Sequence, residues 1–421
     1  MKRFGDGRDV FFERRFGLYI HWGLYAIPAW HEQVLWRTKM TRAEYEPLMH
    51  QFDPVRYDPD TWVSLAKDSG MQYINFTAKH HDGFCMFDTA YTDYKVTNSP
   101  YGRDTLEMLA NACARQNLPL SIYYSLPDWH HPDCPNEGKH HQMFAPRPGD
   151  TQIRERYYEY VRNQIRELMA NYGPIYQLFW DINVDNFEDP ALNDEIRRMQ
   201  PNILINDRGP GPGDYCTPER HFEDINEFPC PTEAVSSFGR ESWGYKEDED
   251  YYTDKYLMQC LDNVLVRGGN YLLNIGPKPD GTLPEQAVRS LGRIADWYAR
   301  VKEAFVDTAP ASYLLRRDEF RMISFNTTVR RERPLATKRG RTVYVHLPED
   351  CSGTGVLLIP MDTLPERAVL LNNGQEVETM VSVTPWHYQE KPYLRLRNLP
   401  VNTITDEPLV IRLDFGEDIV R

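Results

Sequence analysis

Ionisable side chains gather directly after one apolar segment of this chain. The segment Tyr73–Thr77 has the composition of a buried β-strand. It is followed by Lys79, His80, His81 and Asp82. Polar groups at the end of a buried strand are costly unless they bond one another or a polar ligand. Because α/β barrel enzymes present residues to a substrate at the carboxyl ends of strands, the pattern predicts a binding site here.

A second segment near the N-terminus repeats this design. His21 and Trp22 follow the apolar residues Leu18–Ile20. A neutral imidazole offers one hydrogen-bond donor and one acceptor, which suits the hydroxyls of a sugar. Aromatic side chains nearby offer flat faces for a pyranose ring. Together the two segments predict a sugar-binding pocket.

These phrases, taken in order, resemble the retaining α-L-fucosidases, which are the family twenty-nine glycoside hydrolases. FGLYIHWG is similar to the phrase that opens the catalytic domain in that family, and TAKHHDGF is similar to the phrase that follows it roughly sixty residues on. The resemblance continues through YYSLPDWHHP, DYCTPER, ESWGY and GGNYLLNIGPKPDGTLP, and it covers about residues 16–305. It implies a retaining exo-α-L-fucosidase that hydrolyses terminal α-L-fucose from glycans by double displacement, through a covalent fucosyl-enzyme intermediate.

Asp181 is the expected nucleophile. Retaining glycoside hydrolysis needs two carboxyl groups about 5–5.5 Å apart, of which one attacks the anomeric carbon. Asp181 ends the apolar run Ile175–Trp180, so a strand terminus can direct its side chain into a pocket. In the fucosidases the nucleophile is the Asp of a W-x-D phrase, and here Phe179 stands in place of the Trp. Asp185 is the nearest alternative.

The expected acid/base is Glu233, on the resemblance alone. A frequent family pattern places this Glu nine residues before the Ser of an SWGY phrase, and counting back from Ser242 gives Glu233. Family members usually carry Trp just before the Glu, where this chain has Thr232. The alternatives Glu223, Glu227 and Glu241 stay open.

The expected substrate-binding residues are His21, Glu32, His80, His81, Tyr124, Phe179, Arg220 and Trp243. The three histidines are expected to contact fucose hydroxyls, whereas Glu32, Tyr124 and Arg220 match pocket positions of the family. Phe179 and Trp243 are expected beside the C6 methyl group of fucose. Each of these polar residues has the alternative of a purely structural hydrogen-bond network.

No metal or cofactor is expected. A histidine-rich stretch comprises His130, His131, Asp133, His140 and His141. Imidazole and carboxylate suit zinc, but this spacing matches no HExxH or Cys/His pattern. The sequence also has no Gly-rich phosphate loop after a strand. The stretch is therefore expected to edge the active site.

Composition excludes several classes of partner. The 421 residues carry a formal net charge of −14, which argues against nucleic-acid binding. No apolar run approaches the roughly 18 residues of a membrane span.

The seven cysteines show no CxxC spacing and are interpreted as reduced or buried thiols. The first residues lack a signal-like apolar core, so the chain as given is expected to be cytoplasmic, or secreted or periplasmic if a leader has been trimmed. The sequence leaves the oligomeric state open.

Alternating strand and helix patterns predict an α/β catalytic domain over residues 1–307. A TIM-like (β/α) barrel is the first expectation and an open doubly wound sheet the alternative. Residues 308–421 carry short β-rich runs and a turn at Asn372–Gly374, which predict a small antiparallel β-sandwich. The expected runs are 320–325, 342–347, 356–359, 368–371, 393–396 and 409–413. This second domain is expected to be a scaffold, with carbohydrate binding as the alternative.

Two other functions remain open from the sequence. One is an α-L-glycosidase of altered preference, for instance for α-L-galactosides. The other is a catalytically silent fucose-binding protein, because non-standard residues surround Asp181 and Glu233. Turnover of an aryl α-L-fucoside separates an enzyme from a binding protein.

Overall fold

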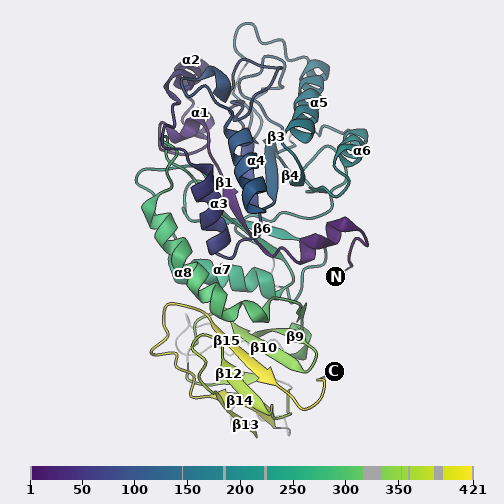
Figure 1. Cartoon of the computed structure of the whole chain (residues 1–421), viewed down its shortest axis with the longest axis vertical. Coiled ribbons are helices and arrows are strands. Elements are labelled where there is room, and N and C mark those ends of the chain that lie inside the picture. Colours follow the sequence, from purple (N-terminus) through teal and green to yellow (C-terminus); the bar gives the residue numbers. More distant parts are fainter. Residues whose placement is uncertain are drawn as a thin grey trace.

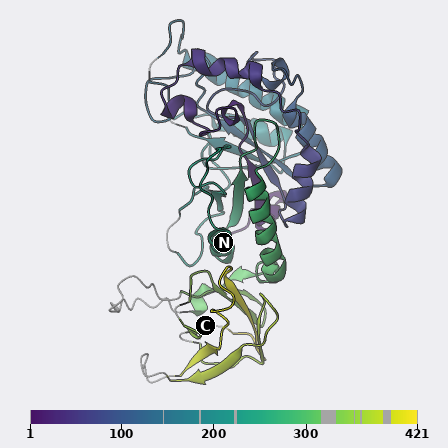
Figure 2. The same ribbon diagram turned by 90° about the vertical axis from the view of Figure 1, so that its left-hand side faces the viewer.

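The computed structural model describes residues 2–144, 146–183, 186–221, 225–315, 333–351, 353–358, 361–383 and 392–419. The helices and the parallel strands form one part of the molecule, and the antiparallel strands of the C-terminal part lie beyond α7 (Asp254–Val266) and α8 (Glu285–Val301) (Figures 1 and 2). The expected run 320–325 and the alternatives Asp185 and Glu223 lie outside the described residues.

A parallel seven-stranded sheet forms the core of the larger part. Its order is β5-β4-β3-β2-β1-β7-β6. The strands are β1 (Phe16–Ile20), β2 (Ile74–Lys79), β3 (Leu120–Ser125), β4 (Ile175–Asp181), β5 (Leu204–Ile205), β6 (Glu233–Ser237) and β7 (Asn270–Ile275). Every residue of these strands is buried, as expected for a sheet covered on both faces. Since β1 pairs with both β2 and β7, the sheet curls like part of a barrel and lacks the strand order of a doubly wound fold.

The two edges of this sheet are linked by one extended segment, residues 215–219. Tyr215 forms an isolated parallel bridge with Asn206, just beyond β5. Glu219 forms another with Val235 in β6. The segment therefore runs between the two edge strands and brings Glu219 alongside β6.

Helices alternate with the strands, as the sequence predicts. They are α1 (Val34–Arg37), α2 (Arg42–Tyr45), α3 (Pro59–Asp68), α4 (Thr105–Gln116), α5 (Arg154–Asn171), α6 (Pro190–Met199), α7 and α8. Short 3₁₀ helices occur at η1 (Gly7–Phe12), η2 (Leu24–Ala26), η3 (Glu46–Gln51), η4 (Val96–Asn98), η5 (Lys302–Ala304) and η6 (Ser312–Leu314). Side-chain caps fix several starts: Asp58 accepts from two N–H groups of α3, and Asp104 caps α4. None of the helices in the described ranges is long and apolar enough to span a membrane.

The C-terminal part consists of two antiparallel sheets. One has the order β12-β15-β10-β9-β8 and the other β11-β14-β13. The strands are β8 (Ala309–Pro310), β9 (Leu335–Arg339), β10 (Thr342–Leu347), β11 (Val356–Leu358), β12 (Arg367–Leu370), β13 (Glu378–Ser382), β14 (Tyr393–Arg397) and β15 (Leu409–Asp414). Both sheets contribute to one apolar cluster, for instance through Val345 and Leu394. The turn predicted at Asn372–Gly374 is present, and Gly374 has a φ of 77° there.

A buried polar contact joins the two parts. His346 of β10 lies with its Nδ1 2.7 Å from Oδ1 of Asp262 in α7, and both side chains are fully buried. The Nε2 of His346 also lies 3.1 Å from the hydroxyl of Thr337 in β9. The C-terminal sheet is therefore anchored to α7 by directed bonds as well as by apolar packing.

Candidate active site

Asp181 lies at the carboxyl end of β4, as its sequence position predicts. Its Oδ2 accepts a hydrogen bond of 2.7 Å from the Tyr123 hydroxyl, and its Oδ1 accepts one of 2.9 Å from Arg208 Nη1. The Nε2 of His81 lies 3.8 Å from Oδ2. Burial alone raises the pKa of Asp181, but Arg208, His81 and Tyr123 outweigh it and the pKa is lowered. The carboxylate is thus ionised at neutral pH, the state that a nucleophile requires.

The three predicted histidines all lie in this region. His21 Nδ1 is 2.6 Å from Asn274 Oδ1, and His81 Nδ1 is 2.6 Å from the Ser125 hydroxyl. His80 packs between them in space, with its ring centroid 5.6 Å from that of His21 and 4.1 Å from that of His81. Burial lowers the pKa of His21 to about 4 and that of His81 to about 3, and it also lowers the pKa of His80. All three imidazoles are therefore neutral, so each can donate one hydrogen bond and accept one.

Two buried polar atoms near these rings have no hydrogen-bond partner among the described residues. They are His80 Nδ1 and Glu32 Oε1. His31 Nδ1 lies 3.2 Å from Glu32 Oε1, but this nitrogen accepts a hydrogen bond from the Gln33 N–H. Buried polar atoms are normally paired, so such atoms beside a site are suited to a polar ligand.

Glu32 also holds the SWGY phrase in place. Its Oε2 accepts hydrogen bonds from the Ser242 hydroxyl at 2.9 Å and from the backbone N–H of Trp243 at 2.8 Å. Burial raises the pKa of Glu32, but His31, His21 and the Trp243 N–H outweigh it, and the pKa is lowered. The ionised carboxylate therefore fixes the position of Trp243.

Trp243 forms one aromatic wall of the site. Its ring stacks on His21 at a centroid distance of 5.5 Å and an interplanar angle of 29°. The guanidinium of Arg220 lies over the Trp243 ring, 4.7 Å from its centroid. Arg220 donates hydrogen bonds to the carbonyls of Gly239 and Arg240, so it supports the wall from behind.

The structure contradicts the prediction that Tyr124 lines the pocket. Tyr124 donates its hydroxyl to Gln164 of α5 at 2.7 Å, whereas Tyr123 donates to Asp181. Side chains alternate between the two faces of a strand, so only one of two adjacent tyrosines can lie on the inner face of the curled sheet. Phe179 also faces the interior, and its ring lies 5.9 Å from that of Tyr123. Tyr123 is therefore the site residue, and Tyr124 belongs to the outer face.

The structure also contradicts the prediction that Glu233 is the acid/base. Glu233 is the first residue of β6, is fully buried, and accepts hydrogen bonds from Tyr73 and from Gln177. Gln177 precedes Asp181 by four residues on β4, which corresponds to about 13 Å along the strand. A carboxyl group at that depth cannot lie about 5–5.5 Å from Asp181. Burial raises the pKa of Glu233 to about 7, partly offset by the bonds from Tyr73 and Gln177.

Glu219 is the acidic side chain that the sequence reasoning missed. Arg208 Nη1 donates to Glu219 Oε1 as well as to Asp181 Oδ1. Two oxygens that bond one nitrogen can be at most about 6 Å apart. The Glu219 side chain is 44% exposed, so a leaving group or a water molecule can reach it. The sequence signal for Glu219 is the DYCTPER phrase, residues 214–220. The phrase supports the resemblance to the family, but it does not by itself indicate that its Glu is a site residue.

The remaining alternatives do not share this contact. Glu241 is exposed, and its Oε2 lies 3.2 Å from Lys246 Nζ. Glu227 is also exposed and lies in the sequence between Glu219 and the start of β6. The second missed residue, Arg208, comes from the segment after β5.

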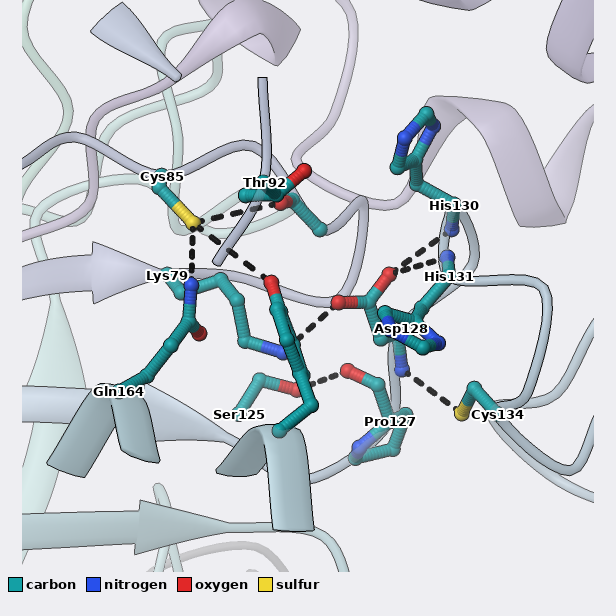
Figure 3. A network of polar contacts seen from close by, with 12 residues as sticks. Lys79, Cys85, Thr92, Ser125, Pro127, Asp128, His130, His131, Cys134 and Gln164 are labelled. Atoms are coloured by element: carbon teal, nitrogen blue, oxygen red, sulfur yellow. Dashed lines mark hydrogen bonds and ion pairs between the residues drawn. The ribbon is translucent and has the colours of Figure 1, made fainter. Parts of the chain in front are cut away.

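A buried ion pair links Lys79, the last residue of β2, to Asp128 in the stretch after β3 (Figure 3). Lys79 Nζ donates to Asp128 Oδ2 at 3.0 Å, and the Lys79 ammonium lies 4.6 Å from the Tyr124 ring centroid. Asp128 Oδ1 in turn accepts from the backbone N–H groups of His130 and His131, as the dashed lines in Figure 3 mark. Asp128 therefore holds the stretch after β3 next to Lys79, the residue that directly precedes His80 and His81. No group of three metal-binding side chains occurs in the part of the chain that the structure describes.

Comparison with known proteins places the chain in a family. The family model for α-L-fucosidase matches residues 6–303. The tissue α-L-fucosidase of Rattus norvegicus is 27% identical over 331 residues, which cover 71% of this chain and 70% of the relative. The solved α-L-fucosidase isoenzyme 1 of Paenibacillus thiaminolyticus is 32% identical with a TM-score of 0.82, over 98% of this chain and 100% of that one. A Bacteroides thetaiotaomicron α-L-fucosidase, solved as a trapped covalent intermediate with 2-fluoro-fucosyl fluoride, shares the fold at 23% identity and a TM-score of 0.79, over 98% of this chain and 97% of that one.

The match spans far more than half of the chain and includes every phrase on which the resemblance was based. The strand ends that carry Asp181, His21, His80 and His81 all fall inside it. This chain is a glycoside hydrolase and belongs to the α-L-fucosidase family.

Proposed function

We propose that the protein is a retaining exo-α-L-fucosidase in which Asp181 is the nucleophile and Glu219 the acid/base. The observation that carries this assignment is the contact of both carboxylates with the same nitrogen of Arg208. It keeps the two nearest carboxylate oxygens within about 6 Å of each other, which is closer than the separation of about 6.5–9.5 Å in inverting enzymes. The covalent intermediate trapped in the Bacteroides fucosidase supports double displacement on this fold.

In the first step, Asp181 attacks the anomeric carbon while Glu219 gives a proton to the leaving oxygen. In the second step, Glu219 takes a proton from water, which attacks the fucosyl ester and releases Asp181. Arg208 and the Tyr123 hydroxyl outweigh the effect of burial and hold Asp181 ionised, ready to attack.

Once the ester forms, Asp181 no longer carries a charge, and Arg208 Nη1 keeps its contact with Glu219. Glu219 then acts as the general base of the second step.

Fucose recognition would come from the walls of the same site. The neutral imidazoles of His21, His80 and His81 and the unpaired Glu32 Oε1 suit the sugar hydroxyls. The Trp243 ring is the apolar surface that suits the C6 methyl group. The substrates are therefore fucosylated glycans or oligosaccharides.

The closed form of the barrel is part of the same proposal. Residues 215–219 would act as the strand that joins the two edges of the parallel sheet, at the junction that carries Glu219. The C-terminal sheets would form a sandwich domain from about residue 308 onward, with a scaffold role.

Three variants test the catalytic assignment. Asp181→Ala should almost abolish turnover of an aryl α-L-fucoside while the fold remains. Glu219→Ala should lose about 10²–10⁴-fold on substrates with poor leaving groups and much less on activated ones. Azide should rescue Glu219→Ala by forming a fucosyl azide of retained configuration. Glu233→Gln is the matched control, because its carboxyl lies far below the site, and it should keep wild-type leaving-group dependence.

The opposite pattern would refute the assignment. Azide rescue of a Glu233 variant, together with near-normal activity of Glu219→Ala on an unactivated glycoside, would restore Glu233 as the acid/base. Absence of any turnover in the wild type would favour a fucose-binding protein. An α-L-galactoside that is hydrolysed as fast as the fucoside would show that the pocket does not select for a methyl group.

A further inference from the structure

Two cysteines meet where the segment that carries Glu219 begins. Cys216 and Cys230 are 14 residues apart in sequence, and their Sγ atoms are 2.8 Å apart. Both side chains are partly exposed to solvent. Small soluble reagents can therefore reach this pair of thiols.

The backbone imposes this approach. The Cys216 N–H donates to the carbonyl of Pro231 at 2.9 Å, and the Cys216 carbonyl accepts from the N–H of Glu233 at 2.9 Å. These bonds form the parallel bridge between Cys216 and Thr232. The two sulfurs thus meet because segment 215–219 pairs with the chain that enters β6, and no rearrangement of the fold is needed to join them.

The other cysteines differ in their surroundings. Cys85, Cys113 and Cys134 are buried, and burial raises the pKa of Cys85 and of Cys113 to about 12. Cys260 is also partly exposed but lies in α7, away from segment 215–219, so it is a matched control for exposure.

We propose that Cys216 and Cys230 form a modification site, at which a small-molecule disulfide such as glutathione disulfide oxidises them to an intramolecular disulfide. One thiolate attacks the reagent, forms a mixed disulfide and releases one reduced thiol. The second cysteine then attacks the mixed disulfide, which releases the second reduced thiol. Two electrons pass from the protein thiols to the reagent, and both protons end on its two thiol products.

Cys216 is the poorer first nucleophile of the pair, and its attack in the second step is favoured by the 2.8 Å distance between the two sulfurs. Burial and the neighbouring Cys230 raise the pKa of the Cys216 thiol to about 12. A thiol of that kind is a poor first nucleophile, because only the thiolate attacks. We therefore expect Cys230 to react first and the rate of cross-linking to rise with pH.

The cross-link would close a ring from residue 216 to residue 230 that contains Glu219 and Arg220. It would restrict the unfolded chain and tie the start of this segment to β6. The importance of Glu219 rests on the proposed function. The cross-link itself does not, and its test uses no activity readout.

Peptide mapping tests the proposal directly. The protein is incubated with glutathione disulfide at pH 8, its free thiols are blocked, and it is digested with trypsin without reductant. Cleavage after Arg208, Arg220 and Arg240 places Cys216 in peptide 209–220 and Cys230 in peptide 221–240. We expect these two peptides to appear as one linked species that dithiothreitol separates, and the oxidised protein to unfold about 2–6 °C higher than the reduced one.

The controls are two Cys→Ser variants. Cys230→Ser should yield neither the linked species nor the rise in unfolding temperature, whereas Cys260→Ser should yield both. The proposal is overturned if wild-type protein gives only separate glutathione adducts on the two peptides. It is also overturned if Cys230→Ser shows the same rise in unfolding temperature as the wild type.

Discussion

The adjacent tyrosines of β3 provide a test of how Asp181 is held ionised. Tyr123 donates to the Asp181 carboxylate at 2.7 Å, and Tyr124 donates to the Gln164 side chain at the same distance. Both hydroxyls are buried, and replacing either Tyr with Phe removes one hydrogen bond and no carbon atom. The two variants therefore remove the same group and differ in which partner loses the bond.

The effect on Asp181 can be estimated from the bond. A hydrogen bond to a charged group contributes about 1.5–3 kcal/mol, and each pKa unit corresponds to about 1.4 kcal/mol. Arg208 and His81 remain beside the carboxylate in Tyr123→Phe, so we expect the pKa of Asp181 to rise by about one unit. Because the ionised form is the active one, kcat/KM should fall about tenfold on the acidic side of the profile and much less at neutral pH.

The assay is the pH dependence of kcat/KM for an aryl α-L-fucoside, with thermal unfolding measured in parallel. Tyr123→Phe should move the acidic limb to higher pH, and Tyr124→Phe should leave it in place. Both variants should lose stability, Tyr123→Phe by about 1.5–3 kcal/mol and Tyr124→Phe by about 0.5–1.5 kcal/mol, because the bond to the charged carboxylate is the stronger one. Equal movement of the acidic limb in both variants, or none in Tyr123→Phe, would refute the role assigned to the Tyr123 hydroxyl.

Three further predictions follow from other parts of the structure. Lys79→Met should lower kcat/KM at least tenfold and destabilise the protein, because it leaves Asp128 buried without its ammonium partner. Lys79→Arg should recover part of the loss, and unchanged kinetics in Lys79→Met would exclude a positioning role for the ion pair. His346→Ala should lower the free energy of unfolding by about 3 kcal/mol in chemical denaturation, since Asp262 then stays buried without its imidazole, while kcat/KM for the remaining folded protein is unchanged. Exhaustive dialysis against EDTA should leave the rate unchanged, and a loss that zinc or calcium restores would contradict a mechanism based on two carboxyl groups.

The sequence was sufficient to predict the elements and the strand ends that carry chemistry. The apolar runs placed β2 and β4 within one or two residues of their observed bounds. Asp181, His21, His80 and His81 come together because the carboxyl ends of neighbouring parallel strands meet at one edge.

The wrong predictions at the site have two causes. One is the face of the strand on which a side chain lies, and the other is its distance from the carboxyl end of the sheet. The choice between Tyr123 and Tyr124 depends on a one-residue register, and both faces of a buried parallel strand are apolar, so the sequence shows no polar alternation to set it. The importance of Arg208 and Glu219 depends on a contact between the segments on either side of Gly209–Asp214, which no local pattern encodes. A phrase can thus identify a segment without telling which of its side chains reaches the site.

Glu233 shows the same limit, and its position leads to a prediction of its own. It is a buried acid whose pKa is raised from 4.5 to about 7, so the folded state holds a proton that the unfolded state releases between these values. Stability contributed by this group is therefore present below about pH 4.5 and is lost as pH rises to about 7, by about 3 kcal/mol in total. Glu233→Gln keeps the shape and cannot ionise, so the variant should gain about 3 kcal/mol relative to the wild type between pH 4 and pH 8 in chemical denaturation. If Glu233 instead faced solvent at the site, the difference in stability between the two proteins would not change with pH, and the placement of this carboxyl group in the protein interior would be wrong.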